Sequence, residues 1–109
     1  MSDDDEQTRA DFADAVNMTA SELEGWLDSD ESKAVGQKDG DDESTGHRSG
    51  RRIVGILRKK KADLTDADLD HMRKVVGYVA RHRAQRPTGD VTDTPWRYSL
   101  MNWGHDPKK

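Results

Sequence analysis

TDADLDHMRKVVGYVARHRAQR, residues 65–86, is the stretch that decides the fold. Its apolar residues recur at intervals of three and four, the period of one helix face. They are Leu69, Met72, Val75, Val76, Val79 and Ala80. Thr65 is suited to cap the helix, and the acidic residues that follow it favour the positive end of the helix dipole. With Pro87 and Gly89 just beyond, the sequence predicts a long amphipathic helix that ends at about Arg86.

Shorter helices are predicted on both sides of this segment. Apolar spacing indicates one over residues 11–17, and a capping-box pattern opens another over 19–30. Ser49 is the predicted N-cap of a helix over 50–61, and a Thr-Pro pair precedes the last one, over 96–103. The sequence shows no strand pattern, internal repeat or heptad. The predicted fold class is therefore all-α, a small bundle of about five helices.

Two segments lack the apolar residues that a core requires. Residues 1–8 are acidic, and we expect them to form a disordered leader. Residues 36–48 are rich in Gly and Asp and predict a long flexible loop. The remaining chain, residues 9–109, has the length of a single helical domain with one core.

The composition excludes several classes of protein. The chain has no cysteine, which excludes disulfides, thiolate catalysis and cysteine-ligated zinc. No apolar run approaches the roughly 18 residues of a membrane span, and the first residues are acidic where a signal peptide is basic. We therefore expect a cytoplasmic protein with no membrane association.

Charge is sorted along the sequence, although the net charge is only −4. Residues 1–31 contain eleven Asp or Glu and one Arg, whereas residues 47–109 contain fifteen Lys or Arg and seven Asp. Such asymmetry is typical of a chain with a polyanionic partner or an acidic regulatory segment.

The basic residues form a pattern on the predicted helices. Arg51 and Arg58 share the polar side of one helix, and Lys74 and Arg81 share that of the next, each pair about 10 Å apart along the axis. The candidate nucleic-acid-binding residues are Arg48, Arg51, Arg52, Arg58, Lys59, Lys60, Lys61, Lys74 and Arg81. The alternative is that these cations are solvated or paired with the acidic half of the chain.

A second candidate site precedes the predicted helix over 50–61. Gly46, His47, Ser49 and Gly50, flanked by arginines, would form an anion-binding loop at the helix N-terminus. The segment lacks the Gly-Lys-Ser/Thr ending of a nucleotide-binding P-loop, which argues against nucleotide hydrolysis. An ordinary flexible entry to the helix is the alternative interpretation.

The aromatic residues near the C-terminus allow a third interpretation. Trp96, Tyr98 and Trp103 would form a partner-binding platform, because Trp and Tyr dominate binding hot spots. Core packing is the stronger alternative, since the chain has few other aromatic residues.

No pattern predicts an enzyme, a metal site or a cofactor. The four histidines, His47, His71, His82 and His105, lack the i, i+4 spacing of a zinc-binding helix and have no neighbouring nucleophile motif. The alternating Asp66, Asp68 and Asp70 lack the glycine and the final glutamate of a calcium loop.

Four motifs together resemble a known family. They are SKAVG at 32–36, STGHRSGR at 44–51, HMRKVVGY at 71–78 and TPWRYSLMNWGH at 94–105. The set is similar to domain-of-unknown-function family 3140, some of whose members are labelled DNA-binding. The resemblance implies the same label here and identifies no site residues.

We therefore predict a non-catalytic protein that binds double-stranded DNA by phosphate contacts, which carry little sequence preference. The alternative is a protein–protein interaction module that docks a partner through the Trp-rich segment or the acidic helices.

Overall fold

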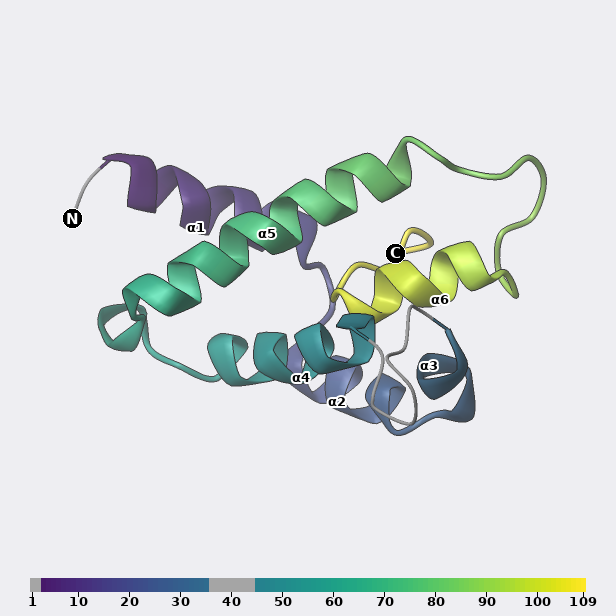
Figure 1. Ribbon diagram of the computed structural model, residues 1–109, viewed down its shortest axis with the longest axis horizontal. Coiled ribbons are helices and arrows are strands. Elements are labelled where there is room, and N and C mark those ends of the chain that lie inside the picture. The colour runs from purple at the N-terminus through teal and green to yellow at the C-terminus, as the bar shows by residue number, and fades with distance from the viewer. Residues whose placement is uncertain (1–2, 36–44) are drawn as a thin grey trace.

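The longest helix, α5 (Asp66–Arg83), forms one side of the molecule together with α1 (Asp3–Ala15), which packs along it (Figure 1). The computed structural model describes residues 3–35 and 45–109. Thr65 begins α5 with a capping box: its Oγ1 accepts from the backbone N–H of Asp68, and its own N–H donates to Asp68 Oδ2 at 3.0 Å. The predicted start of this helix is confirmed, and its end lies three residues before the predicted Arg86.

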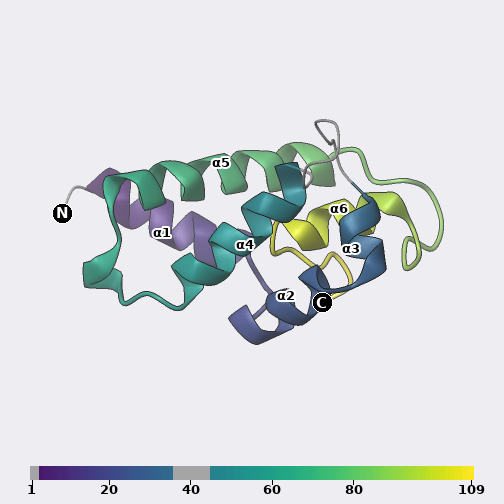
Figure 2. The ribbon, with the colours of Figure 1, turned by 60° about the horizontal axis from the view of Figure 1, so that its bottom comes forward.

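A second group of helices packs against this pair (Figure 2). α2 (Ala20–Leu27) lies along α4 (Thr45–Leu57), while α3 (Asp30–Ala34) and α6 (Pro95–Asn102) pack beside them. A single 3₁₀ turn, Lys61–Asp63, connects α4 to α5. The all-α prediction is confirmed, with six α-helices and no strand in residues 3–35 and 45–109.

One core joins the helices. Leu23, Ile53, Val75 and Leu100, from α2, α4, α5 and α6, have no exposed surface. α6 begins as predicted, with Thr94 Oγ1 accepting from the backbone N–H of Arg97 and proline in the first position. The single core agrees with the apolar stripes expected from the sequence.

The predicted leader is wrong for the part of it that the structure describes. Residues 3–8 form the first turns of α1, and residues 1–2 lie outside the described residues. Thr8 is buried and donates from its hydroxyl to Asp4 O, and Asp5 binds Arg73 of α5 at 3.0 Å. Contacts with α5 therefore stabilise an acidic segment that has few apolar residues of its own.

The predicted bounds of the helix over 50–61 are also wrong. α4 begins at Thr45 rather than at Gly50, and it ends at Leu57 rather than at Lys61. Ser49 is therefore not an N-cap, and its Oγ lies 2.9 Å from His71 Nε2 inside the bundle. The predicted loop over 36–48 falls mostly on residues 36–44, outside the described residues, and its last four residues are helical.

Gly50 is needed where α4 crosses the end of α6. A Cβ at this position would lie 2.5 Å from Asn102 O and 2.7 Å from Leu27 Cδ2, closer than such atoms can approach. A glycine that the sequence presented as a loop residue thus allows three helices to approach closely.

Candidate anion-binding groove

The predicted row of cations on α4 divides between two sides of the helix. Arg51 and Arg58 face α2: Arg58 Nη1 lies 2.6 Å from Glu24 Oε2, and Arg51 lines a hollow with Glu24 and Asp28. Arg48 and Arg52 instead line a hollow toward α5. The acidic helix α2 is thus the neighbour of one pair, and α5 is the neighbour of the other.

Asp68 lies beside two of the predicted cations, Lys59 and Arg52. Its Oδ2 accepts from Lys59 Nζ at 2.6 Å, and its Oδ1 lies 3.7 Å from Arg52. The hydrogen bond from Lys59, with that from the backbone of Thr65, lowers the pKa of Asp68 to about 2. Lys60 and Lys61 are exposed beyond the end of α4, away from its first turn.

Two adjoining hollows lie between the first turns of α4 and the helices α5 and α6. The outer hollow, of about 240 Å³, is lined by Thr45, Arg48, Ser49, Arg52, His71, Lys74 and Trp103. The inner pocket, of about 340 Å³, is lined by Thr45, Gly46, Lys74, Tyr78, Arg81, Ser99, Asn102 and Trp103. Together they form what we call the basic groove. It has four cationic side chains and, among its lining residues in the described part of the chain, no carboxylate.

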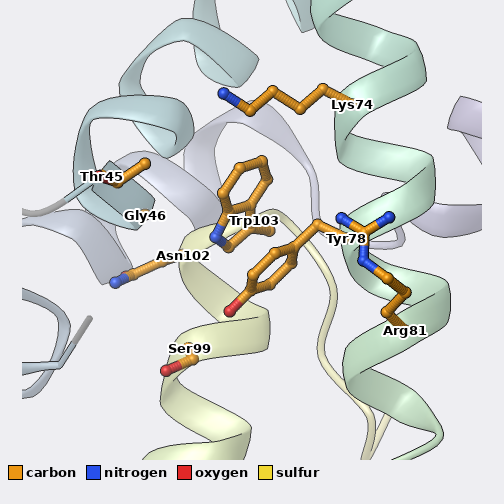
Figure 3. Close-up of a pocket in the computed structure, with 8 residues that line it drawn as sticks. All are labelled: Thr45, Gly46, Lys74, Tyr78, Arg81, Ser99, Asn102 and Trp103. Carbon is orange, nitrogen blue, oxygen red and sulfur yellow. The ribbon is translucent and has the colours of Figure 1, made fainter. Parts of the chain in front are cut away.

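Figure 3 shows the inner pocket. Lys74 extends from α5 toward α4, and the rings of Tyr78 and Trp103 stack face to face with their centroids 4.2 Å apart. Burial raises the pKa of the Tyr78 phenol more than its hydrogen bond with Ser99 lowers it, so the phenol stays protonated at neutral pH. Tyr78 and Ser99 therefore both present hydroxyl groups to the pocket.

The Tyr78–Trp103 pair belongs to a longer column of stacked rings. α5 contributes His71, Tyr78 and His82, and α6 contributes Trp103 and Trp96, with interplanar angles of 12–15° between neighbours. The column fixes α6 against α5 and so sets the back wall of the groove.

His71 joins the outer hollow to this column. Burial lowers the pKa of its imidazole, and the nearby charges of Arg52 and Lys74 lower it further. The ring is therefore neutral at pH 7, and the groove's positive charge comes from its Arg and Lys side chains.

The four residues of the predicted anion-binding loop are helical. Ser49 and Gly50 are buried in the second turn of α4, and His47 donates from Nε2 to Leu27 O at 2.7 Å. Gly46 is the member that lines the inner pocket, with Thr45 before it. The loop interpretation is therefore corrected to a helix start whose first turn borders the pocket.

Two of the three aromatic residues predicted as a partner-binding platform belong to the hydrophobic core. Trp96 and Trp103 are buried, and Trp96 donates from Nε1 to His82 O at 2.7 Å. Tyr98 is half-buried, with its ring 5.4 Å from that of Trp26. The core interpretation of the two tryptophans is confirmed.

The family suggested by the four sequence motifs is also found by comparison of the chain with models of known protein families. A family model described as a protein of unknown function (DUF3140) matches residues 11–101. The chain belongs to this family. The predicted resemblance is confirmed, and the DUF3140 match contains the four cations of the groove. No curated protein and no solved structure is detectably similar to the chain.

Two polar residues of this DUF3140 protein were not predicted to line a site. Ser99 faces the inner pocket, and Asn102 is a buried centre of hydrogen bonds. Asn102 Oδ1 accepts from Trp26 Nε1 at 2.8 Å and from Ser32 Oγ, and its Nδ2 donates to Ser32 O. The sequence carries no signal for this role, because the partners lie 70 or more positions away.

Two other features of the described residues of the DUF3140 chain bear on function. No group of three or more His, Cys, Asp or Glu side chains is arranged to hold a metal ion in this part of the chain. The helices within it are also too short or too polar to cross a bilayer.

Proposed function

We propose that this DUF3140 protein binds the phosphate backbone of double-stranded DNA through the basic groove, without catalysis. The observation that carries the proposal is the gathering of Arg48, Arg52, Lys74 and Arg81 around hollows whose described lining contains no carboxylate. Clustered cations on one face are the usual electrostatic footprint of nucleic-acid binding.

The spacing of these cations supports backbone contacts. Lys74 and Arg81 are seven residues apart on α5, about 10 Å along the axis, and both side chains line the inner pocket. Arg48 and Arg52 are one turn apart on the facing helix. Contacts of this kind orient a duplex without reading its bases, and we expect little sequence preference.

The intramolecular ion pairs reduce the set of predicted cations that we assign to DNA contacts. Arg58 is paired with Glu24 at 2.6 Å, and Lys59 with Asp68 at 2.6 Å, so we assign the contacts to the groove rather than to the run of cations after α4. Arg52 lies farther from Asp68, at 3.7 Å, and also lines the outer hollow of the groove. A protein-interaction module that uses the acidic helices remains the alternative. Docking of a partner protein on the Trp-rich segment has less support, because the rings of Trp96 and Trp103 are buried.

A titration of one duplex at two salt concentrations tests the proposal. Counterion release makes log K fall with log salt by about −0.9 per phosphate contact, so four contacts give a slope of about −3 to −4. Duplexes of different sequence should bind with similar affinity. Absence of detectable binding at low salt would contradict the proposal and leave the acidic-helix alternative.

A further inference from the structure

The inner pocket presents more hydrogen-bond donors than backbone contacts with DNA would use. Lys74 and Arg81 supply charged donors, and Tyr78 and Ser99 supply hydroxyl groups. Thr45 and Gly46 belong to the first turn of α4, where backbone N–H groups and the dipole favour an anion. This donor set suits a multiply charged oxyanion held on several sides at once.

The indole N–H of Trp103 adds a further donor at the wall of the pocket. The two other tryptophans donate to protein acceptors, Trp26 to Asn102 Oδ1 at 2.8 Å and Trp96 to His82 O at 2.7 Å. Trp103 is only 4% exposed, and the indole ring that carries its Nε1 lines the inner pocket. In Figure 3 this nitrogen faces the side of the pocket formed by Gly46 and Asn102.

An indole N–H can only donate, so at the wall of a pocket it favours an acceptor oxygen. A Cβ at Gly46 would lie 3.1 Å from this nitrogen, so glycine keeps the first turn of α4 open beside it. An anion in the pocket would have this N–H, Lys74 and Arg81 among the donors around it.

We infer that the inner pocket binds a phosphate monoester whose organic part is no larger than a nucleoside. A monoester carries up to two negative charges on oxygens that only accept, which matches a pocket lined by donors. Its volume of about 340 Å³ is near the lower end for small-molecule sites and limits the size of the ligand. An internal phosphodiester continues on both sides and fits such a pocket less well than a terminal phosphate does.

This chemistry has two sources, a free phosphorylated small molecule and the phosphorylated end of a DNA strand. The inference goes beyond binding of the internal backbone and does not rest on it. A monoester can bind in the inner pocket in the absence of a duplex, and a duplex that contacts Lys74 and Arg81 would compete with it for these cations.

Indole NMR signals provide the direct test. The chain has three tryptophans and hence three indole ¹H–¹⁵N peaks, and Trp103→Phe identifies the one at the pocket. A nucleoside 5′-monophosphate should shift the Trp103 peak in a saturable way and leave the peaks of Trp26 and Trp96 nearly unchanged. The unphosphorylated nucleoside should shift none. If the monophosphate leaves the Trp103 peak unmoved at millimolar concentration, the inference is wrong.

Variants separate the pocket from general attraction of anions. Arg81→Gln should weaken monophosphate binding at least tenfold, and Ser99→Ala about threefold. Lys60→Gln is the charge-matched control, because Lys60 is exposed beyond the far end of α4, about 20 Å away. It should change the affinity less than twofold. Equal losses in Arg81→Gln and Lys60→Gln would contradict the pocket and indicate non-specific attraction.

Duplexes with and without a 5′-phosphate distinguish the two sources. A phosphorylated duplex that binds more tightly, with a gain lost in Arg81→Gln, assigns the pocket to DNA ends. Equal binding of both duplexes, combined with saturable monophosphate binding, assigns it to a free small molecule. Failure of both duplexes to bind contradicts the proposed function alone, whereas failure of every monoester contradicts only this inference.

Discussion

Lys59 Nζ lies 2.6 Å from Oδ2 of Asp68, the same oxygen that accepts the backbone N–H of Thr65 at the start of α5. One buried carboxylate therefore both caps the longest helix and neutralises a cation that follows α4. The ion pair fixes the connection between α4 and α5, and with it the positions of Arg52 and Lys74 across the groove.

Asp68→Asn should lower the free energy of unfolding by about 1–2 kcal/mol, because it weakens a capping box and removes an ion pair with a partly exposed lysine. The pKa of Asp68 is about 2, below its ordinary 3.8. Its stabilisation is therefore complete above about pH 4 and is lost as the pH falls toward 2. Urea unfolding at pH 7 and pH 3 measures both effects. An unchanged difference between the two pH values in Asp68→Asn would show that another group carries the pH dependence.

Arg48→Gln should weaken duplex binding more than Arg58→Gln does, although both remove one positive charge from the same helix. Arg48 lines the basic groove, whereas Arg58 is paired with Glu24 on the side of α2. Loss of one phosphate contact reduces the magnitude of the salt slope by about 0.9. Fluorescence anisotropy over a range of salt gives the slope for each variant. Equal slopes for Arg48→Gln and Arg58→Gln would mean that DNA responds to net charge rather than to the groove.

Gly50→Ala and Gly55→Ala should have opposite effects on stability. A Cβ at position 50 would meet Asn102 O at 2.5 Å, whereas nothing lies within 4 Å of one at position 55. We expect Gly50→Ala to cost about 1–3 kcal/mol through overpacking, and Gly55→Ala to add about 0.5–1 kcal/mol by improving helix propensity. Thermal unfolding of the two variants provides the comparison. A tolerated Gly50→Ala would mean that α4 can move away from α6.

The helices that could be predicted best from the sequence are those whose ends are determined locally. Thr65 and Thr94 cap α5 and α6 by hydrogen bonds to residues three positions ahead. Such bonds depend only on nearby residue types. The start of α4 was predicted wrongly because Gly46 and Gly50 resembled loop residues. Glycine is needed at both positions because Asn102 and Trp103, which are more than 50 positions away in the sequence, lie close to their Cα atoms.

The cations of the candidate site could be predicted from the sequence, whereas their neighbours in the fold could not. Arg48, Arg52, Lys74 and Arg81 were all among the predicted cations, since helical periodicity places charges on surfaces. Periodicity does not identify the neighbour of each surface, so the sequence leaves pairing with the acidic half of the chain as an alternative, and Arg58 adopts it with Glu24. Nor does periodicity reveal that the ring of Tyr78 packs on that of Trp103.

His82→Phe should reduce the loss of stability between pH 7 and pH 5. His82 lies in the ring column between Tyr78, at 5.2 Å, and Trp96, at 6.1 Å. Its Nε2 is buried without a hydrogen-bond partner among the described residues, and burial lowers the pKa of the imidazole. The unfolded chain therefore takes up a proton more readily than the folded one below the ordinary value of 6.5. Stability is complete above that pH and falls as the pH drops below it.

Phenylalanine keeps an aromatic ring in the column and has neither a titrating group nor an unpaired nitrogen. Urea unfolding of the wild type should give a lower free energy at pH 5 than at pH 7, and the difference should shrink in His82→Phe. A residual difference is expected, because burial also lowers the pKa of His71 and His105. Asp68 titrates below this range and does not contribute. If His82→Phe keeps the full wild-type difference, protonation of His82 does not limit the stability of the column, and His71 and His105 are the groups to which the difference is then assigned.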